Sequence, residues 1–174
     1  VAASIVAAAS IMFFYLSSRQ KFSKRVSLIS ASAFGLATST WSISSQALWQ
    51  HGPANLVLVV GLYFLLKSNR AFRLTHVFLY LFLAGICFGF LPSVRPTSAV
   101  FSIFILSYVI YFYRYRTVVF LLGFASYLPA LLWNWHNFKK LSGGYGNVFG
   151  TLPYDFGFQH FSWTGMAPLI SPSR

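Results

Sequence analysis

Acidic residues are almost absent from this chain of 174 residues, in which Asp155 is the single carboxylate and glutamate does not occur. Thirteen lysines and arginines therefore give a net charge of +12. One acid cannot supply the paired carboxylates of a glycosidase site or the carboxylate-rich cage that holds calcium. Either the chain needs almost no negative charge for its function, or the carboxylates that matter lie outside it.

Cysteine is scarce as well, since Cys87 is alone and lies within an apolar run. It cannot form an internal disulfide and is expected to act as a small hydrophobic side chain. The histidines His51, His136 and His160 have neither ligand spacing nor a cysteine partner, so the sequence supports no metal site and no cofactor. Asp155 follows a proline and a tyrosine, which is typical of a turn residue and makes it a weak candidate for a general base.

Hydrophobic residues are abundant, at 57% of the chain, whereas charged residues make up only 8%. Soluble domains carry about a quarter of their residues as charged side chains. The basic residues occur in short clusters between long apolar runs, a pattern that argues against nucleic-acid binding despite the positive charge. The composition predicts an all-α, polytopic integral membrane protein whose immediate partner is membrane lipid.

Six apolar stretches are near the lower limit for crossing a bilayer, which takes about 20 helical residues. They predict a transmembrane helical bundle over residues 1–135. The remaining segment, 136–174, is rich in glycine and proline and is expected to form an irregular loop region on the outer face. The predicted spans are 1–17, 26–41, 53–66, 74–92, 97–113 and 117–135.

Basic residues fall mainly in alternate connections between these stretches. Positive-inside bias places such connections in the cytoplasm, and residues 42–52, 93–96 and those after 135 on the opposite side. The alternation supports a multi-pass topology. The cytoplasmic basic residues would be Arg19, Lys21, Lys24, Arg25, Lys67, Arg70, Arg73, Arg114 and Arg116.

The two ends of the sequence suggest truncation. Val1 already lies inside an apolar stretch, and the sequence stops at Arg174 without a recognisable terminal element. We therefore expect an internal fragment that is truncated at both ends.

The predicted outer loop places aromatic planes beside hydrogen-bonding side chains. Tryptophans of this kind can stack on a sugar ring while polar neighbours bind its hydroxyl groups. The other interpretation is an aromatic belt at the membrane surface with ordinary polar loop residues. The residues concerned are Trp41, Gln46, Trp49 and His51.

Arg95 lies between two predicted spans, flanked by Pro92 and Pro96. A lone arginine at a membrane boundary must face water, protein or an anion, and its guanidinium matches the oxygens of a phosphate. Alternatively, Arg95 anchors the helix end by extending its charged group toward water. Both interpretations remain open from the sequence.

Four segments in order resemble the multi-spanning glycosyltransferases that use a polyprenyl-phosphate-linked sugar, the superfamily of protein mannosyltransferases and bacterial aminoarabinose transferases. No single segment is specific, but their order and the predicted topology agree with that family. The segments contain TSTWSISS and LWQHGP within 38–53, AG and RPT within 84–97, LLWNW and GGYG within 131–146, and PLISPSR at 168–174.

This resemblance implies transfer of a sugar from a polyprenyl-phosphate donor to a lipid, glycan or protein acceptor at the outer face of a bacterial cytoplasmic membrane. Arg95 would contact the lipid phosphate, and the tryptophan-rich loop would line the substrate cavity. The family's catalytic aspartate lies in the first outer loop, which this sequence lacks, so no catalytic residue is expected in the fragment. We expect that carboxylate upstream of Val1 and expect the fragment alone to be inactive.

Two other classes of protein share the same composition. A transporter or lipid flippase would use Arg95 to guide an anionic substrate and would carry a paired broken helix in its other half. A non-catalytic membrane scaffold would need none of these side chains for chemistry.

Overall fold

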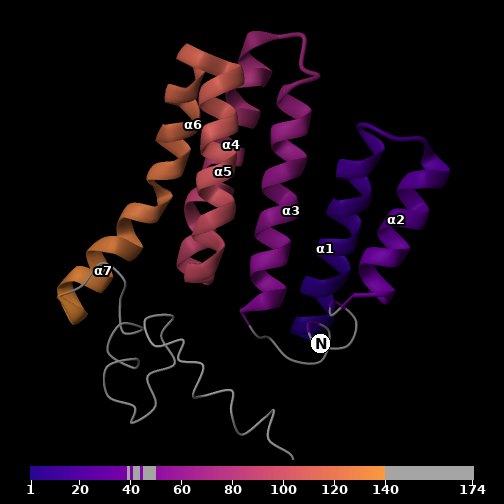
Figure 1. Ribbon diagram of the computed structural model, residues 1–174, viewed down its shortest axis with the longest axis horizontal. Coiled ribbons are helices and arrows are strands. Elements are labelled where there is room, and N and C mark those ends of the chain that lie inside the picture. Colours follow the sequence, from indigo (N-terminus) through magenta and orange to yellow (C-terminus); the bar gives the residue numbers. More distant parts are fainter. Residues whose placement is uncertain (39, 41–43, 45–49, 140–174) are drawn as a thin grey trace, which may run out of the picture. The chain divides into compact units, whose positions relative to one another are not determined.

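The computed structural model describes residues 1–38, 40, 44 and 50–139, and every regular element in this part is a helix. The chain divides into two compact units, residues 1–128 and 129–174. Figure 1 shows the succession of helices along the chain. The helices are α1 (Ala2–Arg19), α2 (Lys24–Leu36), α3 (His51–Ser68), α4 (Leu74–Val94), η2 (Pro96–Ser98), α5 (Ala99–Tyr113), η3 (Arg114–Arg116), α6 (Thr117–Phe124), η4 (Ala125–Tyr127) and α7 (Leu128–Phe138).

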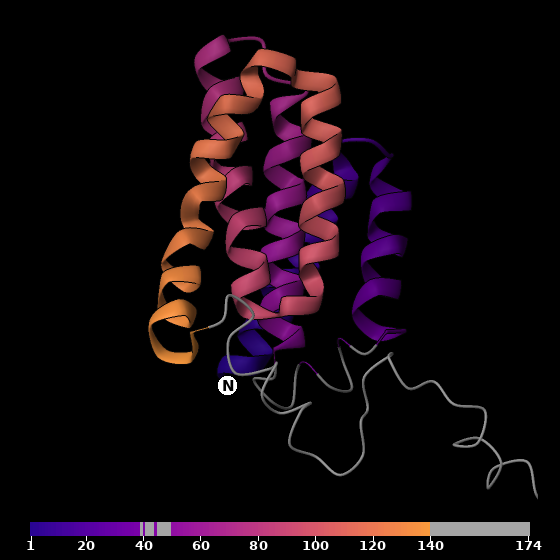
Figure 2. The ribbon, with the colours of Figure 1, turned by 60° about the vertical axis from the view of Figure 1, so that its left-hand side comes forward.

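Several of the described helices have the length and hydropathy of membrane spans. Within the described residues, three helical stretches are long and apolar enough to cross a bilayer: Ala2–Arg19, Leu74–Val94 and Pro96–Phe138. The third stretch reverses direction at Arg114, which has a φ of 48°. Thr117 Oγ1 then donates to Val109 O at 3.2 Å, so α5 and α6 run antiparallel (Figure 2). The described fold is compatible with an integral membrane protein.

The second predicted span differs most from the observed helix. The sequence predicts a span over 26–41, but α2 covers Lys24–Leu36, only 13 residues. At 1.5 Å per residue this helix is about 20 Å long, less than the roughly 30 Å of a hydrocarbon core. The helix begins early because Ser23 caps it, with Ser23 Oγ accepting a hydrogen bond from the Val26 amide at 3.5 Å.

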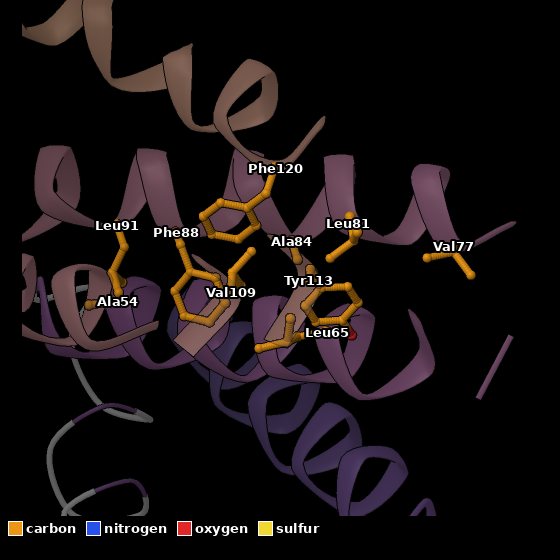
Figure 3. Packing of buried hydrophobic residues seen from close by; sticks show 10 residues of the cluster. All are labelled: Ala54, Leu65, Val77, Leu81, Ala84, Phe88, Leu91, Val109, Tyr113 and Phe120. Carbon is orange, nitrogen blue, oxygen red and sulfur yellow. The ribbon is translucent and has the colours of Figure 1, made fainter. Parts of the chain in front are cut away.

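The hydrophobic core of the first unit lies where α3, α4, α5 and α6 pack together (Figure 3). Phe88 and Phe120 are completely buried, and their ring centroids are 6.3 Å apart. Such aromatic contacts add to the packing of the surrounding aliphatic side chains. The core therefore ties α4 to α6 and holds the helix that leads to Arg95. Its members are Ala54, Leu65, Val77, Leu81, Ala84, Phe88, Leu91, Val109, Tyr113 and Phe120.

Three glycines allow α4 and α6 to approach each other closely. A Cβ atom added to Gly85 would overlap the backbone oxygen of Phe120, and one added to Gly123 would overlap that of Phe82. Gly89, one turn after Gly85, likewise meets the backbone of α6. Small residues spaced four apart bring helix backbones together in this way in membrane proteins.

The end of α4 contains a proline whose effect is compensated by a neighbouring helix. Pro92 lacks the amide that would donate to Phe88 O, four residues earlier. Ser102 Oγ, from α5, donates to Phe88 O instead at 2.7 Å, and Ser102 is buried. The helix can therefore continue to Val94, two residues beyond the predicted end of this span.

Ser102→Ala is expected to lower the free energy of unfolding by about 1–2 kcal/mol, because it leaves the buried Phe88 carbonyl without a donor. Unfolding by titration with a denaturing detergent would measure the change. Ser107→Ala is the matched control, since Ser107 bonds to Ile103 O within its own helix and is exposed. Equal stability of the two variants would contradict the claim that Ser102 stabilises α4 through its hydrogen bond to Phe88 O.

Candidate functional site

His51 is the first residue of α3 and is exposed. The helix tolerates Pro53 because amides of the first turn have no partner inside a helix. Ala54 N donates to Gln50 O at 3.0 Å and completes the first turn. A Cβ atom on the buried Gly52 would lie 3.5 Å from Ser44 Cβ, so Ser44 packs beside the start of α3.

Arg95 terminates α4 and is partly buried. Its backbone is extended, with φ −148° and ψ 112°, as expected for a residue that precedes a proline. Its amide donates to Leu91 O at 3.1 Å, and its carbonyl accepts from Ser98 N at 2.9 Å. The position of Arg95 is thus fixed on both sides by backbone hydrogen bonds.

The fold brings these two predicted site residues together, although they are 44 residues apart in sequence. Arg95 Nη1 lies 2.7 Å from His51 Nδ1. A guanidinium can only donate, so Nδ1 must accept the hydrogen bond and the ring proton resides on Nε2. The side chains form the His51–Arg95 pair, in which the remaining N–H groups of both residues are donors.

The His51–Arg95 pair has the electrostatic character of an anion site. Arg95 contributes a permanent positive charge, and the amino-terminal end of α3 adds the positive end of a helix dipole. No acidic residue lies within the described part of the chain to neutralise that charge. A phosphate group, which accepts several hydrogen bonds, is the kind of anion that such donors bind.

The described residues contain no group of three or more histidine, cysteine or acidic side chains that could hold an ion. His136 lies on α7, in the second compact unit, and is exposed.

Other predicted site residues lie outside the part of the chain that the structure describes: Trp41, Gln46, Trp49 and Asp155. Their proposed roles stay predictions. Ser44, from the same predicted outer segment, is described and is 2% exposed. Its hydroxyl has no hydrogen-bond partner among the described residues.

Comparison with protein-family models, curated proteins and solved structures finds no match to this chain.

Proposed function

We propose that this chain is part of a multi-pass glycosyltransferase of the bacterial cytoplasmic membrane that takes a sugar from a polyprenyl-phosphate donor. The acceptor would be a lipid, glycan or protein on the outer face. The His51–Arg95 pair would hold the phosphate that remains on the lipid as the sugar leaves. Cationic hydrogen-bond donors stabilise the charge that develops on such a leaving group.

The observation that carries this proposal is the 2.7 Å contact between Arg95 and His51. Two of the family-like segments, LWQHGP and RPT, supply these two side chains. A snorkelling arginine would need only water around its charged end, whereas Arg95 is oriented by a specific partner. The described residues contribute this phosphate contact and no carboxylate that could act as a general base, because none of them is acidic.

The test is binding of undecaprenyl phosphate to the detergent-solubilised protein, compared with undecaprenol, which has the same chain and no phosphate. We expect the phosphate-bearing lipid to bind about tenfold more tightly or better, as charge-assisted hydrogen bonds allow. Equal affinity for the two lipids would refute the proposal, since the polyprenyl chain alone would then account for binding. Transfer of labelled sugar from a polyprenyl-phosphate donor is expected only from the full-length enzyme, which would supply the catalytic carboxylate, and would be measured in membranes that contain it.

A further inference from the structure

A second concentration of positive charge lies at the opposite end of α3 and α4 from the His51–Arg95 pair. A pocket of about 570 Å³, here called the basic pocket, is formed by the end of α1, the end of α3, the α3–α4 connection and the start of α4. His51 and Lys67 are 16 residues apart on α3, or about 24 Å along its axis. The basic pocket is therefore separate from the first site. Its lining residues are Leu16, Arg19, Gln20, Tyr63, Lys67, Arg70, Ala71, Phe72, Arg73, His76 and Tyr80.

Four basic side chains line this pocket: Arg19, Lys67, Arg70 and Arg73. No acidic side chain exists among the described residues to pair with them. Arg70 and Arg73 are exposed, and the structure shows only backbone hydrogen bonds for them within its described part. Positive-inside bias explains why basic residues lie on this side, but it does not require that segments far apart in sequence share one pocket.

The wall of the pocket orients Lys67. Lys67 Nζ donates to Tyr63 OH at 3.1 Å and lies 5.2 Å and 5.0 Å from the ring centroids of Tyr63 and Tyr80. The hydrogen bond to Tyr63 raises the pKa of Lys67, which lies just outside the predicted span 53–66, and burial opposes this effect. Gln20 Nε2 donates to Tyr63 O at 3.2 Å and joins α1 to this wall. The ammonium group is thus positioned and remains charged at neutral pH.

Exposed apolar side chains border the same cations. Phe72, between Arg70 and Arg73, has its whole side chain exposed, and Leu74 is 56% exposed. Large apolar side chains beside basic ones are typical of a segment at the membrane interface, where ring and aliphatic groups enter the lipid. This combination favours a lipid headgroup over a soluble anion as the occupant.

We propose that the basic pocket binds the phosphate headgroup of an anionic phospholipid on the membrane face opposite the His51–Arg95 pair. Basic pockets between membrane helices on the cytoplasmic side bind such headgroups. Arg70 and Arg73 contact the phosphate oxygens from the α3–α4 connection, and Lys67 contributes charge from the wall. The bound lipid links α1, α3 and α4 at this end.

The experiment measures cardiolipin binding to the solubilised protein by native mass spectrometry. Arg70→Gln/Arg73→Gln is expected to weaken cardiolipin binding about tenfold or more, the loss expected for charge-assisted hydrogen bonds. The control Lys24→Gln/Arg25→Gln removes the same charge from exposed positions of α2 that do not line the pocket, and should change binding by less than about twofold. Arg70→Lys/Arg73→Lys keeps the charge and should retain part of the affinity for cardiolipin. Retained binding would also show that the α3–α4 connection still folds when both arginines are replaced.

Equal weakening in the two neutral double variants would overturn the proposal, because net charge would then explain binding. The same experiment includes inorganic phosphate as a soluble anion and phosphatidylcholine as a lipid without net charge. Displacement of cardiolipin by an equal concentration of inorganic phosphate would reassign the pocket to a soluble anion. Arg95→Gln should leave cardiolipin binding unchanged, so this site and the glycosyltransferase proposal can fail independently.

Discussion

Gly85→Ala and Gly123→Ala are each expected to lower the free energy of unfolding by ~2–3 kcal/mol, because the added methyl group meets backbone atoms rather than a movable side chain. The obstructing atoms are the carbonyl oxygens of Phe120 and Phe82. The two helices must therefore separate, which also disturbs the contact between Phe88 and Phe120. Titration with a denaturing detergent, followed by circular dichroism, would measure the loss.

Gly35→Ala is the matched control for this pair. Its new Cβ atom would meet the side-chain end of Ile11, 2.7 Å away, and a side-chain end can rotate out of the way. We expect the control to lose less than about 1 kcal/mol. The double variant of Gly85 and Gly123 should lose less than the sum of the single losses, since both act on one interface. If the two losses of unfolding free energy added fully, the two glycines would not act on the same helix interface.

Arg95→Gln is expected to weaken binding of undecaprenyl phosphate about tenfold to a hundredfold, the range for a lost charge-assisted interaction. Undecaprenol binding should stay the same, because its hydroxyl carries no charge for the guanidinium to bind. Arg95→Lys should recover only part of the loss, since an ammonium group cannot present the planar fork of a guanidinium. Lipid titrations with the solubilised protein would measure all three effects.

Arg25→Gln provides the control for net charge, since Arg25 is exposed in the first turn of α2 and belongs to neither site. His51→Ala should weaken phosphate binding less than Arg95→Gln, because it removes the partner that orients the guanidinium rather than the charge itself. If Arg95→Gln and Arg25→Gln had equal effects, Arg95 would be no more than a helix anchor.

Local features of the fold were predictable from the sequence. Apolar runs predicted α1, α4 and the α5–α6 region, and the break at Arg95 follows from Pro96, because a residue before proline adopts extended backbone. The early end of α2 was missed, since its serines and alanines continue the apolar pattern weakly past Leu36. Gly85 and Gly89 form a small-residue spacing that could have predicted the close contact with α6.

The candidate site was predictable only as separate residues. Arg95 is notable in the sequence because charge is rare near apolar spans, and His51 because it lies in the predicted outer aromatic segment. Their pairing depends on the position of α3 relative to α4 along the helix axes. Packing in the core sets that position, and the sequence of neither helix alone specifies it.

The amino-acid sequence by itself determined that this protein is helical and compatible with a membrane, because hydropathy acts locally along a chain. It also determined that acid is scarce and that basic residues cluster in alternate connections between apolar stretches. Tertiary structure alone decided which distant cations share a site. Antiparallel packing of α3 and α4 places His51 against Arg95 at one end and gathers Lys67, Arg70 and Arg73 at the other. The described residues contain no acid that could pair with either group of cations.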